Sequence, residues 1–93
     1  MKVFDKALWH IDAGEDSEAV LAKFQAVLDF LYEKNLLNEE GQEIYEFGVD
    51  DSISLNENIV TEEGAAFLDK HYDEVINFGA GRIAAELNLR YPS

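Results

Sequence analysis

The sequence predicts a mainly α-helical protein, a small single-domain helical bundle of four or five helices spanning residues 1–93. Three observations lead there. The chain has 93 residues, room for one core. Its apolar fraction of 47% is high enough for a packed interior despite a net charge of −13. Apolar residues recur at helical spacing along most of the chain, with a short β-hairpin near residues 52–60 left open as an alternative to a loop.

The first two elements are predicted on either side of Gly14. Residues 3–11 have helical spacing, although a short strand would also suit them, and Gly14 ends either version. Asp16 or Ser17 then provides an N-cap for a long helix reaching Lys34. We expect this helix to be central, because its wide apolar face contains Val20, Leu21, Phe24, Val27, Leu28 and Leu31.

Two later segments resemble each other and predict two further helix starts. Asn38-Glu39-Glu40-Gly41 and Thr61-Glu62-Glu63-Gly64 each place a capping residue before two acids, which suit the positive end of a helix dipole. One helix should begin near residue 39 and stop at Gly48, and the other should begin near 62 and reach about Phe78. Common capping chemistry explains the repeat better than a duplicated functional motif.

The remaining segments are shorter. Ile53 and Leu55 alternate with serines, so residues 52–60 form either a hairpin or an irregular packed loop. Residues 79–81, Gly-Ala-Gly, break the helical pattern, a final helix is expected over 82–89, and residues 91–93 are expected to fray.

The most informative feature for function is the distribution of charge. No Lys or Arg stands between Lys34 and Lys70, a stretch that carries ten carboxylates. Such a stretch repels nucleic acid and acidic membrane surfaces and attracts basic partners. The predicted element order also suits a winged helix–turn–helix module, but the helix over 39–47 carries four Glu and no base. We therefore expect no DNA binding, because DNA-binding helices meet phosphates with Lys or Arg; a helix–turn–helix shape that binds protein stays open.

Motifs for catalysis, metals or cofactors are weak, so we expect no enzyme, no metal and no cofactor. The chain has no cysteine for a nucleophile or a thiolate site. Residues 50–58 place oxygen donors at alternate positions, but Leu55 and Thr61 stand where a calcium loop needs glycine and glutamate. His10 and His71 lack a partner at helical metal-site spacing, and a site would require them to converge in the fold.

A candidate partner surface lies in the helix near 39–47 and just after it. Three of its glutamates share one helix face. Tyr45, Phe47 and Tyr32 are candidate aromatic anchors, and core packing is the alternative, which the sequence favours more for Phe47 than for Tyr45. A solvated surface without a partner is the alternative interpretation. The predicted partner-binding residues are Glu39, Glu43, Tyr45, Glu46, Asp50 and Asp51.

These features favour a non-catalytic, acidic, cytoplasmic protein-binding domain. The leading hypothesis is a bacterial, immunity-protein-like inhibitor that neutralises a basic partner such as a nuclease-like toxin, since nucleases present basic clefts to phosphate. The alternative is a self-associating structural or adaptor domain, with a homodimer formed through apolar residues of the C-terminal segment. Those residues are Ile83, Leu87, Leu89 and Tyr91.

Overall fold

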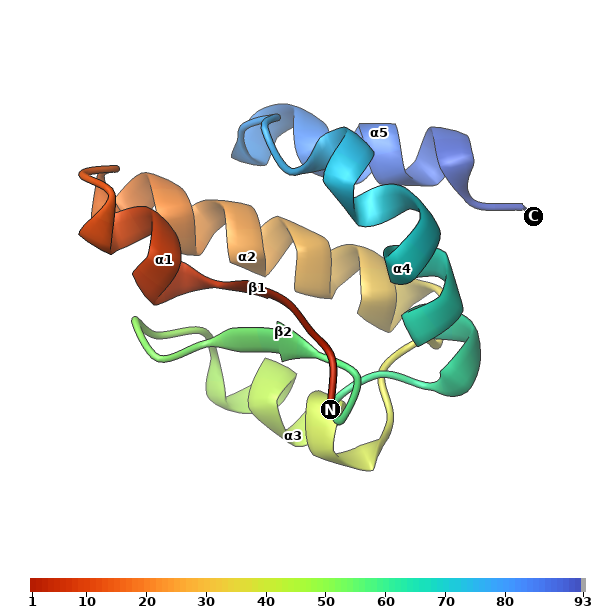
Figure 1. Ribbon diagram of the computed structural model, residues 1–93. Coiled ribbons are helices and arrows are strands. Elements are labelled where there is room, and N and C mark those ends of the chain that lie inside the picture. The colour runs from red at the N-terminus through yellow and green to blue at the C-terminus, as the bar shows by residue number, and fades with distance from the viewer. Residues whose placement is uncertain (93) are drawn as a thin grey trace.

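The computed structural model describes residues 1–92 and confirms a mainly helical fold with a small antiparallel sheet. Helix α2 crosses the middle of the molecule, with α4 and α5 on one side and the β-strands and α3 on the other (Figure 1). The elements in chain order are β1 Val3–Lys6, α1 Ala7–Asp12, α2 Ser17–Glu33, α3 Glu39–Phe47, β2 Ser54–Asn56, α4 Glu62–Val75 and α5 Ala80–Arg90.

The long helix α2 forms the centre of the core, as its apolar face predicts. Asp16 caps it, its carboxylate accepting a hydrogen bond from the Ala19 amide at 3.0 Å. The helix packs most extensively against α5, whose Ile83 and Leu87 are fully buried. No helix within residues 1–92 combines the length and the apolar character needed to cross a membrane.

The N-terminal segment contains both of the elements that its pattern allowed, a strand followed by a short helix. β1 pairs antiparallel with β2, matching Val3 with Asn56, Asp5 with Leu55 and Lys6 with Ser54. A bulge between Val3 and Asp5 places one extra residue in β1. Bulges re-aim the neighbouring side chain, and here Asp5 is buried.

Of the two alternatives for residues 52–60, the local hairpin is not formed, although part of the segment is a strand. Ile53 and Leu55 bury their side chains, and the strand finds its partner at the N-terminus of the chain. Beyond β2, the Ile59 amide donates to the Asn56 carbonyl at 3.3 Å, and Val60 forms a bridge with Leu37. Because the chain turns away at this point, the wing of a winged helix module is not formed.

The two similar helix starts lie next to each other. In each, the amide of the glycine donates to the capping side chain, Gly41 to Asn38 at 2.9 Å and Gly64 to Thr61 at 3.1 Å. The Asn38 amide also donates to the Ile59 carbonyl at 3.1 Å. Reciprocally, the Thr61 amide donates to the Leu36 carbonyl at 2.8 Å. These two hydrogen bonds flank the bridge between Leu37 and Val60 and hold the two capped helix starts together.

Both glycines of the repeat are required by close approach of the backbone. A Cβ atom on Gly41 would lie 2.0 Å from the Ile59 carbonyl oxygen, and one on Gly64 would lie 2.9 Å from that of Leu36. Because the two glycines have no side chain, each helix start packs directly against the backbone that leads into the other helix. This requirement explains the glycines, and capping explains the residues before them.

Three helix ends differ from expectation by a few residues. α3 ends before Gly48 (φ 95°) as predicted, whereas α4 stops at Val75 and α5 spans Ala80–Arg90. The expectation that Tyr91 frays is wrong. Its ring contacts those of Phe30 and Phe67, with centroids 5.7 and 5.4 Å apart, which holds it against the core. Ser93 lies outside the described residues.

Candidate functional site

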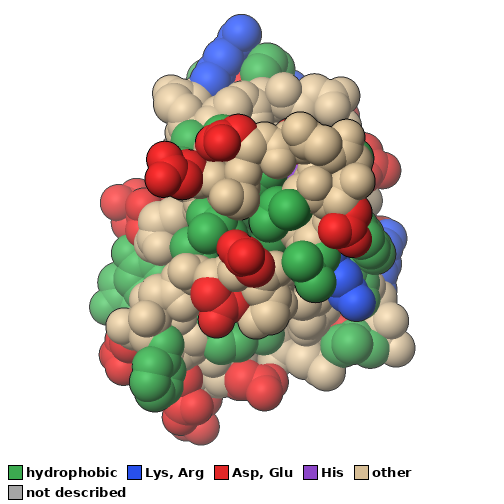
Figure 2. Space-filling view, turned by 90° about the vertical axis from the view of Figure 1, so that its left-hand side faces the viewer, with side chains coloured by type: hydrophobic (Ala, Val, Ile, Leu, Met, Phe, Trp, Pro, Cys, Tyr) green, Lys and Arg blue, Asp and Glu red, His purple; other side chains and the backbone are tan. Residues whose placement is uncertain are grey.

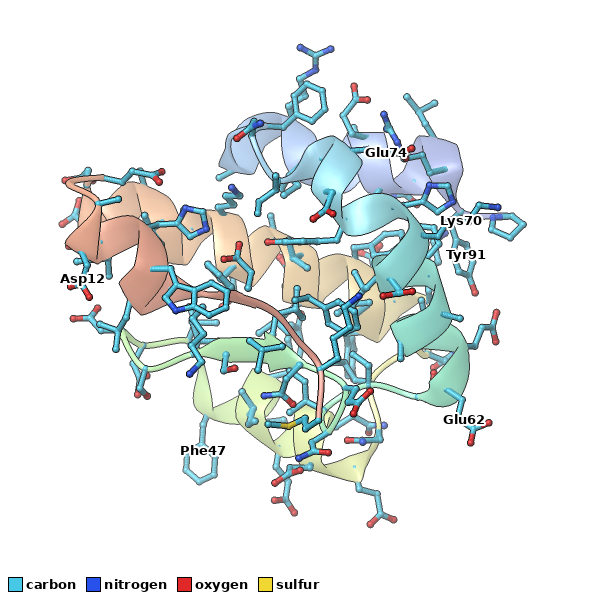
Figure 3. All side chains as sticks on the ribbon, in the orientation of Figure 1. Asp12, Phe47, Glu62, Lys70, Glu74 and Tyr91 are labelled. Atoms are coloured by element: carbon cyan, nitrogen blue, oxygen red, sulfur yellow. The ribbon has the colours of Figure 1, made fainter. Side chains whose placement is uncertain are left out.

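Helix α3 presents most of its surface to solvent. Of its nine residues only Gly41 is buried, while Ile44 and Tyr45 are half-buried. Phe47, at its C-terminal end, is 93% exposed and projects away from the rest of the molecule (Figure 3). The core packing that the sequence favoured for Phe47 over Tyr45 is therefore not found, and the ring faces solvent.

The acidic residues predicted on this helix are all exposed, and Asp50 and Asp51 follow directly after Gly48. Within residues 1–92 none of them forms an ion pair. Figure 2 faces the side where α1 ends, α2 begins and the loop between α3 and β2 lies, and it shows acidic side chains spread among hydrophobic ones, with few basic groups. We call the following set the α3 acidic surface: Glu39, Glu40, Glu43, Glu46, Phe47, Asp50 and Asp51.

Six of the seven basic side chains contact groups elsewhere in the fold, and none of the seven forms an ion pair with this surface in the described part of the chain. Lys2 pairs with Asp69, and Arg90 pairs with Glu74 and Glu86. Arg82 also pairs with Glu86. Three lysines are held by rings or by a carbonyl: Lys6 lies over Trp9, Lys34 over Tyr91, and Lys23 donates to the Ile76 carbonyl.

Tyr45 lies on the side of α3 that faces α2. Its ring stacks on Tyr32 with centroids 4.5 Å apart, and its hydroxyl donates to Asp29 at 2.7 Å. The hydrogen bond to Asp29 raises the pKa of the Tyr45 hydroxyl. Tyr45 is thus packed on α2 and Phe47 is exposed, whereas the sequence favoured burial of Phe47 over burial of Tyr45.

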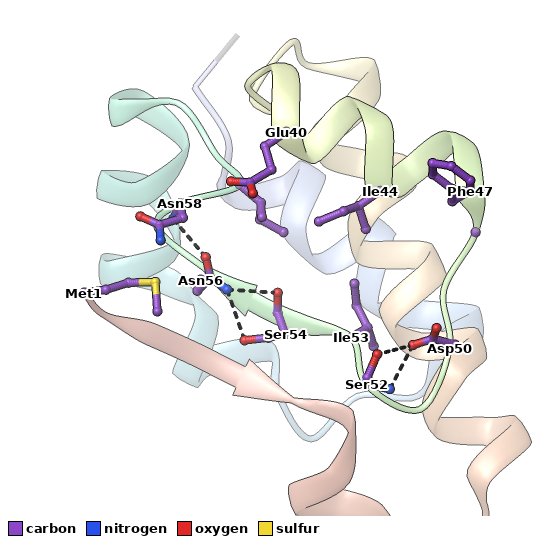
Figure 4. A pocket seen from close by; sticks show the side chains of 12 residues that line it. Met1, Glu40, Ile44, Phe47, Asp50, Ser52, Ile53, Ser54, Asn56 and Asn58 are labelled. Carbon is purple, nitrogen blue, oxygen red and sulfur yellow. Dashed lines mark hydrogen bonds between the residues drawn. The ribbon is translucent and has the colours of Figure 1, made fainter.

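A groove of about 380 Å³ runs between α3 and β2 (Figure 4). We call it the α3–β2 groove. Glu40 and Asp50 lie toward its two ends, and the Asp50 carboxylate accepts hydrogen bonds from the Ser52 hydroxyl and amide, which lower the pKa of Asp50. The other side chains that line it include Ile44, Phe47, Ser54 and Asn56.

A second polar cluster, centred on Asp5, is buried in the core. The Asp5 carboxylate is 1% exposed and accepts hydrogen bonds from the Tyr72 hydroxyl at 2.7 Å and from His10 Nε2 at 2.8 Å. His10 Nδ1 lies 2.8 Å from Glu15, so the ring bridges two carboxylates. Burial alone would lower the pKa of His10, but the hydrogen bonds to Asp5 and Glu15 outweigh it, and the pKa is raised.

This cluster was not found from the sequence. Asp5 and His10 belong to different elements, and Tyr72 is far along the chain, so no spacing rule joins them. Burial and the nearby Asp5 charge also raise the pKa of Tyr72, which keeps its hydroxyl protonated as a donor. The cluster ties β1 and α1 to α4, which is a structural role.

The two histidines are not brought together. His10 meets Asp5 and Glu15, whereas His71 meets Glu74, with Nδ1 and the carboxylate oxygen 2.8 Å apart. The part of the chain that the structure describes holds no group of three side chains arranged to bind a metal ion. The convergence that a histidine-based site requires is therefore not present in this fold.

Comparison with known proteins adds no further assignment. No protein-family model, no curated protein and no solved structure matches the chain. The candidate site therefore rests on its own geometry, the α3 acidic surface and the groove beside it.

Proposed function

We propose that this protein binds a basic protein partner through the α3 acidic surface, with Phe47 as the central contact. The observation that supports the proposal most strongly is the exposure of Phe47, 93%, beside carboxylates that no basic side chain neutralises. A large aromatic ring in water loses hydrophobic free energy that burial against a partner would recover.

The residues of the surface divide into two roles. Aromatic residues dominate the buried centre of interfaces, which suits Phe47. The surrounding carboxylates speed the encounter with a positively charged surface and discriminate against acidic partners. Glu39, Glu43 and Glu46 line one side of α3, and Asp50 and Asp51 extend the charge beyond its end.

The partner class that fits best is a protein with a basic, phosphate-binding cleft. A nuclease-like toxin has such a cleft, and an acidic domain that covers it excludes nucleic acid. In this role the protein acts as an immunity-protein-like inhibitor in the cytoplasm. It contacts the partner and neither nucleic acid nor a membrane.

A second candidate is self-association through the far side of the molecule. Leu89 on α5 is 79% exposed, whereas Ile83 and Leu87 of the same helix are fully buried. A homodimer through Leu89 leaves α3 free, while one through α3 would bring like charges together. Sedimentation of the wild type and a Leu89→Ser variant at micromolar concentration separates the two cases.

The proposal is tested by affinity capture at low salt, using wild-type protein and a Phe47→Ser variant as baits. We expect the wild type to retain a basic protein that elutes as salt is raised, and the variant to retain much less of it. If the captured protein degrades nucleic acid, the wild type should inhibit it at stoichiometric concentration. Equal retention by both baits would contradict the central role of Phe47.

A further inference from the structure

The outer edge of β2 is unpaired and opens beside the α3–β2 groove. Within residues 1–92 the sheet contains β1 and β2 alone, so one edge of β2 has no neighbouring strand. Unpaired strand edges present backbone donors and acceptors that can accept another strand. The groove runs along this edge, with α3 forming its opposite wall (Figure 4).

The hydrogen-bond pattern identifies which backbone groups point outward. The Ala7 amide donates to the Ile53 carbonyl at 3.1 Å, which makes Lys6 and Ser54 a non-hydrogen-bonded pair. The Glu57 amide donates to the Lys2 carbonyl at 3.0 Å, which places Asn56 in the same class. The backbone amides and carbonyls of Ser54 and Asn56 therefore point away from β1.

The outward carbonyls are partly occupied, and the outward amides are free. The Asn56 side-chain amide lies 3.4 Å from the Ser54 carbonyl, and the Ile59 amide donates to the Asn56 carbonyl at 3.3 Å. The backbone amides of Ser54 and Asn56 meet no acceptor in the described part of the chain. Two donors two residues apart are the spacing that one edge of an added strand accepts.

The charges of the groove specify the side chains of such a strand. Alternate residues of an added strand point to the same face, so every second side chain would lie beside Ser54 and Asn56. Glu40 and Asp50 stand toward the two ends of this groove, and hydrogen bonds keep Asp50 ionised. Phe47, whose ring is exposed, lines the end of the groove near Asp50.

We infer that the partner inserts an extended segment with alternating Lys or Arg residues into the α3–β2 groove, where it pairs with β2 as a third strand. This inference rests on the proposed function and specifies how the partner is held. The backbone amides of Ser54 and Asn56 donate to its carbonyls, its basic side chains meet Glu40 and Asp50, and its aliphatic side-chain stems pack on Phe47.

The test uses a synthetic eight-residue peptide that alternates Lys and Thr, titrated into the whole protein at low salt. Its control is the same peptide with N-methyl groups on alternate residues, which keeps the charge and blocks pairing along one edge. We expect the control to bind about tenfold more weakly, because it loses the backbone hydrogen bonds. We also expect hydrogen exchange of the Ser54 and Asn56 amides to slow only with the unmodified peptide.

A Ser54→Pro variant removes one outward donor without touching the ladder to β1 and should weaken binding of the unmodified peptide by a similar factor. If that variant does not fold, hydrogen exchange of the Ser54 and Asn56 amides in the wild type still decides the test. Equal binding of the two peptides with unchanged exchange, or no binding of either, would overturn strand addition. The two peptides could also bind equally to the wild type, with neither binding after Glu39, Glu43 and Glu46 are reversed to Lys. That result would support binding by the acidic surface and contradict pairing with β2.

Discussion

Helices α3 and α4 begin with nearly the same four residues and end in opposite environments. Both start with a capping residue, two glutamates and a glycine whose amide donates to the cap. α4 then buries four large side chains in the core, whereas α3 buries only its glycine. Phe67 of α4 and Phe47 of α3 illustrate the difference, because their side chains are 8% and 93% exposed.

The comparison separates what holds the fold from what is left for a partner. The shared start is explained by capping and by contact between the two helix starts, so its repetition does not by itself indicate a function. The outer face of α3 is different, because its acids neither form ion pairs nor cover a core. We therefore assign binding to the exposed acidic face of α3 and to the acids that follow its end.

The largest difference between the helices is expected from truncating their phenylalanines. Phe67→Ala should lower the free energy of unfolding by about 3–5 kcal/mol, because it leaves a cavity next to Phe30 and Tyr91. Phe47→Ala should change it by less than about 0.5 kcal/mol, as surface substitutions do. Urea unfolding of both variants checks this, and a large loss in Phe47→Ala would place that ring in the core.

Substituting alanine for Gly41 or Gly64 should destabilise the protein to different extents, according to how closely each glycine approaches the backbone. Gly41→Ala should destabilise by about 3 kcal/mol, since its Cβ would meet a backbone oxygen at 2.0 Å, and Gly64→Ala by about 1–2 kcal/mol. Gly81→Ala is the control. It lies in α5 with open space around it, so alanine should be neutral or stabilise by up to about 1 kcal/mol. Thermal unfolding ranks the three, and a neutral Gly41→Ala would refute the close approach.

Each helix also has a tyrosine that donates to a carboxylate at 2.7 Å, Tyr72 to Asp5 and Tyr45 to Asp29. Tyr72→Phe should cost about 1–3 kcal/mol, because it removes a donor from a buried charge. Tyr45→Phe should cost much less, since water can replace the lost donor at a half-exposed site. Equal losses in a denaturant titration would mean that the two pairs are equally buried.

The smallest effect is the pH dependence that His10 contributes. The pKa of His10 is raised in the folded protein above its unfolded value of about 6.5, so the protonated ring stabilises the fold. This contribution is complete below about pH 6.5 and is lost as pH rises through the folded pKa. The groups that face the ring are Asp5, Glu15 and, with the opposite effect, Lys23.

A His10→Gln variant isolates that contribution. It should be less stable than the wild type by about 1–3 kcal/mol at pH 5.5, the range of a charge-assisted hydrogen bond, and the gap should narrow above neutral pH. Measuring urea unfolding of both proteins at several pH values gives the curve. A gap that widens with pH would mean that the neutral ring is the stabilising form.

Local chemistry is the part of the fold that the sequence predicts well. The caps at Asp16, Asn38 and Thr61 and the stop at Gly48 depend on neighbours within one turn, and all of them are present. The partner of Ser54–Asn56 could not be predicted, because β1 lies about fifty residues earlier and its own pattern also suits a helix. Alternation shows that a strand is half-buried without showing what it pairs with.

The candidate site divides in the same way. The acidic face of α3 follows from helical spacing, and its residues are exposed as that spacing implies. The exposure of Phe47 did not follow, because an aromatic residue at the end of a helix packs or projects according to where the chain goes next. The Asp5 cluster joins three elements that meet only in the folded chain, so no signal in the sequence marks it.

The most direct test of the account is calorimetric titration of the captured basic partner with two charge-reversed proteins. One carries Lys at Glu39, Glu43 and Glu46, and the other carries Lys at Asp12, Glu18 and Asp73, which are exposed and lie outside the α3 acidic surface. Both change the net charge equally. We predict that the first loses about a hundredfold in affinity at low salt and the second only a few-fold, because close like charges cost several kcal/mol. Equal losses in the two proteins would contradict the assignment of binding to α3.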